Sequence, residues 1–207
     1  MIPVMYEDQW LLIVDKPTGL LVIPTPKNEK HTLTNLLNEK AKKENILYRL
    51  HPCHRLDRDT SGLIIYAKGK STQQKMMDEF KNKRIKKTYI AFVQGKLPAG
   101  EGEIRKRIEG QDSLTRYKVI RQSNDFGIVA VMPVTGRKNQ IRIHFRQIGN
   151  PILGDTRFVF RRHFKIKVNR LCLHAKALEF IHPITKQKIT VETELPDKMK
   201  KFLERGK

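Results

Sequence analysis

The chain alternates short apolar runs with polar or charged connections, and most of the runs are too short to form long helices. Runs that are rich in β-branched and aromatic residues and bounded by turn residues are typical of strands. The first two runs are separated by Asp15-Lys16-Pro17-Thr18-Gly19, so we expect a hairpin or a bent strand pair there. The predicted strands cover residues 10–14, 20–23, 63–67, 88–95, 114–121, 128–132, 171–180 and 189–193.

Four helices are predicted where apolar residues recur at spacings of three and four. The first covers residues 32–44. The second follows Ser71-Thr72-Gln73-Gln74, which matches a capping box, and the third ends at Gly149, a natural C-cap. The apolar residues that define the four helical faces are Leu33, Leu36, Leu37 and Ala41; Met76, Met77 and Phe80; Ile141, Phe145 and Ile148; and Met199, Phe202 and Leu203.

Strands outnumber helices and connect mostly through short turns. This pattern predicts an α+β fold with a large, mostly antiparallel sheet and flanking helices. A chain of 207 residues is long enough for one substantial core. The sequence contains no repeat, low-complexity segment or linker, so we expect a single domain over residues 1–207.

Positive charge dominates the composition. Lysine and arginine number 42 against 21 aspartate and glutamate residues, a formal net charge of +21. Such an excess indicates a polyanionic partner. An anionic membrane is disfavoured, because no apolar run approaches the roughly 20 residues of a spanning helix, and residues 1–8 lack the layout of a signal peptide. We therefore expect a cytoplasmic protein that binds nucleic acid and not a membrane.

Two segments concentrate this charge. Residues 81–87 hold five basic residues, and residues 157–170 hold six, interleaved with three phenylalanines. A solvated helix end is the ordinary interpretation of the first segment, and a phosphate-facing patch is the alternative. Basic and aromatic residues together suit unstacked RNA, whereas phenylalanines are as often part of a core. Both alternatives stay open for each segment.

Cysteine and histidine positions do not favour a metal site. Cys53 and Cys172 are the two cysteines of the chain, and their wide separation predicts no disulfide framework. His51, Cys53 and His54 combine imidazole and thiol within four residues. They lack the two separated ligand pairs of a zinc site, and Pro52 restricts how they could converge, so we expect no metal here.

The segment His54–Leu63 carries the densest candidate chemistry. Two carboxylates, two guanidiniums and an imidazole lie within residues 54–59, and a Ser-Gly turn then leads into the predicted strand at 63–67. A strand that begins where such charges end can present a site on a rigid element. The alternative is a solvated loop in which an aspartate caps a turn. Local chemistry does not choose between Asp57 and Asp59.

Three strings resemble the motifs of the RluA-type pseudouridine synthases and follow the order of that family. They are His54-Arg55-Leu56-Asp57, a Lys-x-Tyr-x-Ala string at residues 87–91, and a Thr-Gly-Arg-x-x-Gln-Ile-Arg-x-His string at residues 135–144. The opening Lys16-Pro17-Thr18-Gly19 and residues 150–155 are also similar. The resemblance extends from about residue 10 to about residue 196. It implies a mixed sheet with a central catalytic cleft, and we expect no added N-terminal RNA-binding domain.

The resemblance implies roles for individual residues. Asp57 corresponds to the catalytic carboxylate, Tyr89 to an active-site tyrosine, and Arg142 to an arginine beside the carboxylate that keeps it ionised. Arg55 is expected either to fill the gap left by an extruded base or to contact phosphate. Asn139 stands where relatives have His, and we expect it to touch none of the catalytic residues. The expected RNA contacts are His54, Arg55, Arg58, Lys86, Lys87, Arg137, Lys138 and Gln140.

The activity implied by the resemblance is the isomerisation of uridine to pseudouridine in ribosomal or transfer RNA. This reaction oxidises nothing and adds nothing, so we expect no cofactor. An RNA stem-loop is the expected substrate, bound by a monomer without an obligatory protein partner. Two other classes remain: a non-catalytic RNA-binding or ribosome-associated protein of the same fold, and a metal-dependent nuclease with Asp57 and Asp59 as ligands.

Overall fold

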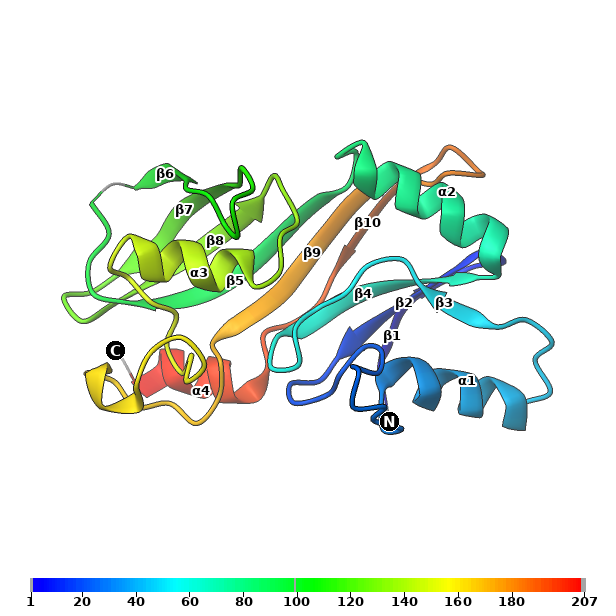
Figure 1. Cartoon of the computed structure of the whole chain (residues 1–207), viewed down its shortest axis with the longest axis horizontal. Coiled ribbons are helices and arrows are strands. Elements are labelled where there is room, and N and C mark those ends of the chain that lie inside the picture. Colours follow the sequence, from blue (N-terminus) through cyan, green and yellow to red (C-terminus); the bar gives the residue numbers. More distant parts are fainter. Residues whose placement is uncertain (1, 99, 206–207) are drawn as a thin grey trace. The chain divides into compact units, whose positions relative to one another are not determined.

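A computed structural model describes residues 2–98 and 100–205 of the chain (Figure 1). The strands are β1 (Val4–Glu7), β2 (Leu11–Lys16), β3 (Leu50–Pro52), β4 (Ser61–Lys68), β5 (Lys86–Gln94), β6 (Glu101–Arg105), β7 (Leu114–Gln122), β8 (Phe126–Pro133), β9 (Leu173–Ile181) and β10 (Lys188–Glu192). The helices are α1 (Leu33–Lys43), α2 (Lys70–Lys81), α3 (Gln140–Gln147), α4 (Asp197–Arg205) and the short 3-10 helix η1 (Arg161–His163).

The strands form a ten-stranded sheet in the order β1-β2-β4-β9-β5-β8-β7-β6, with β3 beside β4 and β10 beside β9. The pairs β1–β2, β2–β4, β5–β8 and β7–β8 are antiparallel. An isolated bridge between Leu21 and Thr32 is parallel. The predicted α+β class with a mixed, mostly antiparallel sheet is confirmed, whereas the central cleft stays a prediction.

The residues gather into two compact units. Unit 1 comprises residues 1–86 and 177–193, and unit 2 comprises residues 87–176 and 194–207. Strand β9 contributes its first half to unit 2 and its second half to unit 1. Each unit has its own apolar core. The single domain expected over residues 1–207 stays a prediction.

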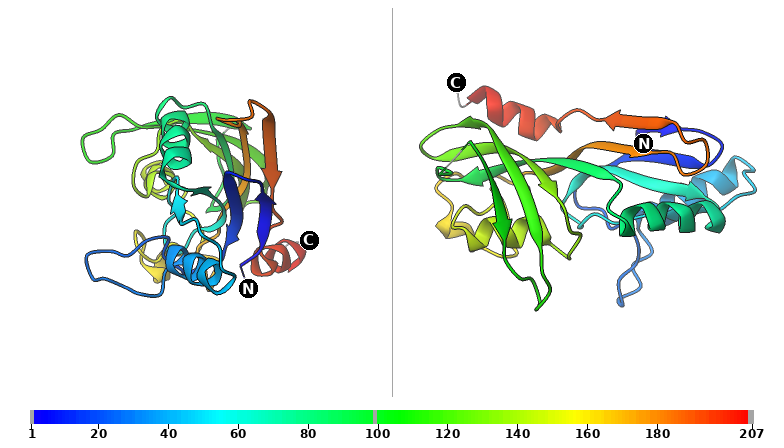
Figure 2. Two further views of the ribbon diagram at one scale, coloured as in Figure 1. Left: turned by 90° about the vertical axis from the view of Figure 1, so that its right-hand side faces the viewer. Right: turned by 90° about the horizontal axis from the view of Figure 1, so that it is seen from above.

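Unit 1 is built around β4, whose residues are buried except for the last. Strand β4 pairs with β2 and β3, helix α2 packs on it, and β10 lies beside β1 (Figure 2). Helix α1 begins as predicted, because the Thr32 hydroxyl accepts a hydrogen bond from the Asn35 amide. Leu33, Leu37 and Ala41 form its buried face.

Unit 2 places α3 against β7 and β8 (Figure 1). Ile141 and Phe145 face the core, and the ring of Phe145 lies 5.7 Å from that of Tyr117. Helix α4 also faces this core: Met199 is fully buried, and the Phe202 ring packs near Phe92 and Phe126. Both helices were predicted by their apolar spacing.

Residues 20–23 do not form the predicted strand. Their carbonyls instead serve the start of α1: Leu21 accepts from the Leu33 amide at 2.8 Å, and Val22 accepts from Thr34 at 3.1 Å. The first amides of a helix lack partners within the helix, so this segment satisfies them. The predicted pairing of residues 10–14 with 20–23 is therefore wrong, and β2 pairs with β1 and β4.

The capping box predicted at residues 71–74 is also wrong. Helix α2 begins at Lys70, and its N-cap is Gly69, whose φ of 104° is open to glycine but strained for other residues. Met76 is fully buried, while Met77 from the same predicted stripe is 46% exposed. Among the described residues, no helix is long and apolar enough to cross a membrane.

Candidate active site

Asp57 lies in a loop between β3 and β4 whose backbone is fixed by a second turn of unit 1. The Arg58 carbonyl accepts hydrogen bonds from the Lys16 ammonium and the Gly19 amide, both at 2.9 Å. The Thr18 hydroxyl donates to the Asp59 carbonyl at 2.7 Å. We call residues 16–19 the framing turn. It holds the backbone on the C-terminal side of Asp57 in one conformation.

Lys16 is the central residue of this frame. Its side chain is fully buried, and its ammonium donates to the carbonyls of Pro17, Leu20 and Arg58 at 2.7–2.9 Å. Three carbonyls match the three N–H donors of an ammonium, which offsets the cost of burying its charge. No role for Lys16 was predicted from the sequence. The feature that could have identified it is a lysine at the end of an apolar strand, in a string similar to that of the family.

The side chains of the Asp57 loop differ in exposure. The Asp57 side chain is half-buried, whereas Arg55, Arg58 and Asp59 are exposed and Leu56 is buried. The turn after Asp57 is closed by the Thr60 amide, which donates to the Asp57 carbonyl at 3.2 Å. Asp57 thus combines a fixed backbone with a side chain that reaches the surface.

His54 is held inside unit 1. Its Nε2 accepts a hydrogen bond from the Ile65 amide at 3.0 Å, and its ring centroid lies 4.7 Å from that of Phe80. An Nε2 that accepts requires the neutral ring with its proton on Nδ1. This geometry makes His54 an anchor between the loop and β4, and it does not support the direct RNA contact that we expected from it.

In unit 2, Arg142 projects from α3 into a buried ion pair. Its Nε and Nη2 donate to the two carboxylate oxygens of Asp155 at 2.9 and 2.6 Å, and both side chains are at most 3% exposed. The guanidinium also lies 5.0 Å from the ring centre of Phe158. A bidentate pair fixes the plane of the guanidinium. Asp155 therefore supplies a counter-charge to Arg142, and the expected position of Arg142 beside Asp57 stays a prediction.

Asn139 contacts Arg142 directly, so the expectation that it touches no catalytic residue was wrong. Its Oδ1 accepts a hydrogen bond from Arg142 Nη1 at 3.0 Å. Asn139 precedes α3 with φ 55° and ψ 22°, a left-handed conformation that asparagine tolerates better than most residues. The departure from the family's histidine therefore bears on the orientation of Arg142.

Gln140 has an internal role. Its side-chain oxygen accepts from the Thr135 hydroxyl and the Arg137 amide, and its nitrogen donates to the Leu114 carbonyl and the Thr115 hydroxyl, at 2.7–3.0 Å. These four bonds use the full capacity of an amide side chain. Gln140 is 4% exposed. It ties the loop before α3 to β7, and this geometry does not support the RNA contact expected from it.

The remaining candidates are two lysines and a tyrosine of β5 and two residues of the 135–139 loop. Tyr89 and Lys87 are half-buried on β5, and burial lowers the pKa of Lys87. Lys86 is exposed but lies 2.7 Å from a Glu179 oxygen. Arg137 and Lys138 are exposed.

The structure thus groups the candidates within the units. Unit 1 holds the Asp57 loop with its framing turn, and unit 2 holds Tyr89 and the Arg142–Asp155 pair. Within the described residues, no group of three His, Cys, Asp or Glu side chains is placed to hold a metal ion.

Comparison with known proteins gives concordant matches. The RNA pseudouridylate synthase family profile matches residues 10–147. The dual-specificity RNA pseudouridine synthase RluA of Haemophilus influenzae is 34% identical, with 90% of each chain covered. The uncharacterized RNA pseudouridine synthase YlyB of Bacillus subtilis is 33% identical over 97% of this chain and 71% of its own.

A solved structure agrees with this fold. Human RNA pseudouridylate synthase domain containing 4 has a TM-score of 0.82 and 24% identity, and the match covers 98% of this chain and 92% of that one. At that identity the likeness concerns the fold, which agrees with the sheet order and the family profile. The chain belongs to the RNA pseudouridylate synthase family, and it is an isomerase that converts uridine in RNA to pseudouridine.

Proposed function

We propose that this enzyme isomerises uridines in folded transfer or ribosomal RNA, with Asp57 as the catalytic carboxylate and no cofactor. The framing turn fixes the backbone of this loop through the Arg58 and Asp59 carbonyls, and the observation that supports Asp57 over Asp59 is burial. Asp57 is half-buried, whereas Asp59 is exposed. The RNA class is supported by relatives named dual-specificity RNA pseudouridine synthase RluA and tRNA pseudouridine synthase C.

The reaction assigns distinct tasks to the protein. The bond between C1′ of the ribose and N1 of uracil breaks, the base rotates, and a bond between C1′ and C5 forms. The C5 proton then leaves and N1 takes up a proton, so the product is an isomer of the substrate. The Asp57 carboxylate attacks or stabilises the reacting centre, and Tyr89 accepts the C5 proton or packs on the uracil ring. Each bond is broken or formed with an electron pair, so the reaction needs no oxidant and no reductant.

Arg142 keeps the catalytic carboxylate ionised in this proposal, because a nearby cation favours the charged form of a carboxylate. Three N–H groups of Arg142 bind Asp155 and Asn139. Asp155 and Asn139 act as positioning residues that orient Arg142.

A stacked uridine must leave its helix before it can reach the carboxylate, which costs a few kcal/mol. Arg55 is exposed in the Asp57 loop, two residues before the carboxylate. We assign it to the gap that the extruded base leaves. The alternative is that Arg55 only contacts phosphate. If Arg55 fills the gap, its loss should impair the reaction of structured RNA more than that of an unstructured strand; if it only contacts phosphate, both should be impaired equally.

The enzyme acts as a monomer in the cytoplasm in this proposal, on an RNA stem-loop bound through its positive charge. The net charge of +21 supports a polyanionic substrate.

Incubation of RNA with EDTA-treated protein tests the proposal. We expect pseudouridine, detected chemically at defined positions, with the strand intact. Binding without isomerisation would favour the non-catalytic RNA-binding class. Strand cleavage that stops in EDTA would favour the metal-dependent nuclease.

A further inference from the structure

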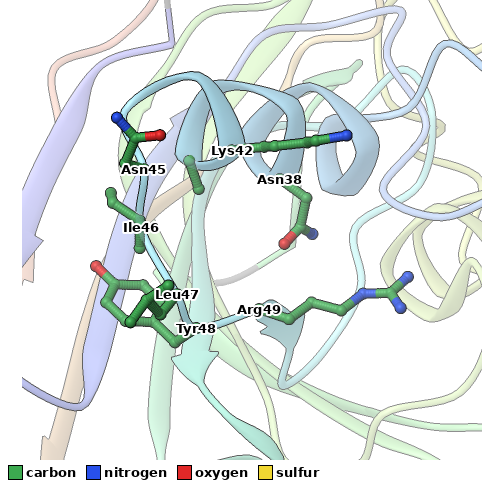
Figure 3. A pocket seen from close by; sticks show the side chains of 8 residues that line it. Asn38, Lys42, Asn45, Ile46, Leu47, Tyr48 and Arg49 are labelled. Atoms are coloured by element: carbon green, nitrogen blue, oxygen red, sulfur yellow. The ribbon is translucent and has the colours of Figure 1, made fainter.

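Unit 1 contains a pocket of about 380 Å³ that belongs to none of the sites described above. It lies between the C-terminal half of α1 and residues 45–49, which lead into β3 (Figure 3). Side chains that contribute to its lining include Asn38, Lys42, Asn45, Leu47, Tyr48 and Arg49. A volume of this size suits a small ligand or one unit of a polymer.

Hydrogen bonds within unit 1 hold the walls of the pocket together. The Asn38 amide donates to the Leu50 carbonyl at 3.0 Å and accepts from the Leu50 amide at 2.9 Å, so α1 is tied to the first residue of β3. The Ile46 amide donates to the Ala41 carbonyl at 2.9 Å, which closes the end of the helix. The pocket is thus a preformed feature of the fold.

The lining combines positive charge with apolar and aromatic surface. Lys42 and Arg49 extend toward the same side of the pocket in Figure 3, with the Asn38 amide between them. Among the described residues that line it, none is acidic. Leu47 is fully exposed, and the Tyr48 ring is half-buried with the Lys68 ammonium 5.0 Å from its centre. Two cations beside an apolar and an aromatic side chain match the phosphate and the base of a nucleotide.

Strand β3 connects this pocket to the Asp57 loop. It begins at Leu50, directly after Arg49, and leads to Cys53, directly before His54. Its pairing with β4 fixes that path, because Leu50, His51 and Pro52 lie opposite Lys68, Ala67 and Tyr66. Residues Ser61 to Lys68 of β4 span about 23 Å between the end of the Asp57 loop and the level of Leu50. Stacked nucleotides of one strand rise by about 3.4 Å each, so this distance corresponds to roughly seven nucleotides.

We propose that the pocket is a second RNA-binding site, which holds a nucleotide about seven positions from the uridine that reacts. Lys42 and Arg49 bind the phosphate, and Leu47 and Tyr48 support the base. The inference rests on the proposed function, in that RNA is the ligand and Asp57 marks the reacting position. The pocket sets where the RNA strand lies relative to the Asp57 loop, and so contributes to the choice of uridine.

A matched pair of double variants on α1 and its following loop tests this site. Lys42→Gln/Arg49→Gln removes the two cations of the pocket. Lys40→Gln/Lys43→Gln removes two cations from the same helix that do not line the pocket. Lys40 is 57% exposed and 3.7 Å from Glu44, a surface pair whose loss has little effect on stability. Thermal unfolding confirms that both variants fold.

For the pocket variant we expect about tenfold weaker binding of a substrate stem-loop. The slope of log K against log salt should fall by about 0.7, since one phosphate contact to a single strand is lost. The control variant should bind within about twofold of the original protein. If the two variants weaken RNA binding equally, general electrostatic attraction accounts for the effect and the inference is overturned.

Crosslinking locates the base independently. A stem-loop with 4-thiouridine about seven positions from the target should crosslink to residues 47–49, and Leu47→Ser/Tyr48→Ser should reduce that crosslink severalfold. Crosslinks confined to other segments would overturn the inference. The original protein is assayed in parallel. If it does not isomerise uridine, the proposed function fails. If it isomerises uridine normally and the pocket variants bind and crosslink RNA like the original protein, only the inference about the pocket is rejected.

Discussion

At the scale of single residues, the choice between Asp57 and Asp59 decides the site. Asp57→Asn keeps the shape of the side chain but removes the charge, so isomerisation should fall by at least roughly a thousandfold while folding and RNA affinity stay nearly unchanged. Asp59→Asn should retain activity, because the frame uses the Asp59 carbonyl and not its carboxylate. Chemical detection of pseudouridine in a defined RNA measures both. Full activity of Asp57→Asn would remove the residue from the mechanism.

Asp155 offers a second test at this scale. Asp155→Asn leaves the buried Arg142 charge without its bidentate carboxylate, so the free energy of unfolding should fall by about 3 kcal/mol or more. Asp57→Asn should cost much less, because Asp155 still compensates Arg142. Denaturant unfolding of the two variants measures the difference. A larger loss for Asp57→Asn would show that the Asp57 loop, and not Asp155, stabilises the arginine.

At the scale of elements, Lys16 joins the end of β2 to the Asp57 loop. Lys16→Met keeps the volume but removes one donor from each of three carbonyls, and the unfolding free energy should fall by about 3 kcal/mol. Because the Gly19 amide binds the same Arg58 carbonyl, its hydrogen exchange should also accelerate. kcat should fall with KM little changed. If the variant is less stable but hydrogen exchange at the Gly19 amide is normal, Lys16 stabilises the core without holding the framing turn.

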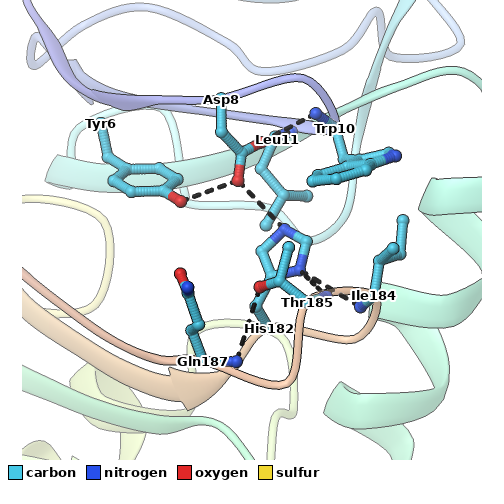
Figure 4. Close-up of polar contacts among 8 residues, drawn as sticks. All are labelled: Tyr6, Asp8, Trp10, Leu11, His182, Ile184, Thr185 and Gln187. Carbon is cyan, nitrogen blue, oxygen red and sulfur yellow. Dashed lines mark hydrogen bonds and ion pairs between the residues drawn. The ribbon is translucent and has the colours of Figure 1, made fainter.

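A second group of contacts between elements, around His182, joins the β1–β2 turn to the β9–β10 turn (Figure 4). Buried His182 accepts at Nδ1 from the Ile184 and Thr185 amides at 3.2 and 3.0 Å, and its Nε2 lies 3.2 Å from Asp8 Oδ2. Burial lowers the pKa of His182, and nearby Lys186 adds to this effect, although Asp8 opposes it. A second proton would take Nδ1 away from both amides.

Because the pKa of His182 is lower in the folded state, unfolded chains bind protons first as the pH falls below about 6.5. The stability that the neutral ring contributes is complete above that pH and is lost as the pH falls toward the folded pKa. The unfolding midpoint should therefore drop between pH 7.5 and pH 5. His182→Asn should be less stable at pH 7.5 but should have a flatter pH profile. Parallel profiles for both proteins would exclude His182 as a contributor.

At the scale of the whole molecule, periodicity in the sequence predicted elements whose partners lie nearby in the chain. Helix α1 is an example, since Thr32 caps it and Leu33 and Leu37 define its buried face. Strands β1, β3 and β6 were missed because they are short and largely exposed or half-buried, so they show no apolar alternation. Their place is set by pairing with β2, β4 and β7.

The residues of the candidate site also differ in whether the sequence alone could identify them. The strings around Asp57, Tyr89 and Arg142 could be found because each is contiguous in the sequence. The Lys16 bond to the Arg58 carbonyl joins residues 42 positions apart, so no local pattern predicts it. Asp155 lies 13 residues from Arg142, in a segment whose sequence predicts a turn. Partnerships of this kind depend on the tertiary fold, which explains why the positioning residues were missed while the motif residues were found.

The structure also distinguishes the two basic segments. In residues 81–87, Lys86 pairs with Glu179, Arg84 pairs with Glu79, and Lys87 is half-buried. In residues 157–170 the basic side chains other than Arg170 are exposed, and Phe160 beside them is 71% exposed while Phe164 is buried. The second segment thus offers more charge to a phosphate backbone, together with an aromatic ring for a base.

RNA binding should therefore depend strongly on salt and unequally on these segments. If about five phosphates are contacted, affinity should fall by a factor of several hundred between 50 and 200 mM salt. Arg161→Gln/Arg162→Gln should reduce the slope of log K against log salt by up to about 1.8, since each duplex phosphate contact contributes about 0.9. Lys86→Gln/Lys87→Gln removes the same formal charge but should change the slope less, because Glu179 already compensates Lys86. Fluorescence titrations at four salt concentrations measure all three slopes, and equal changes in the two variants would show that net charge alone governs binding.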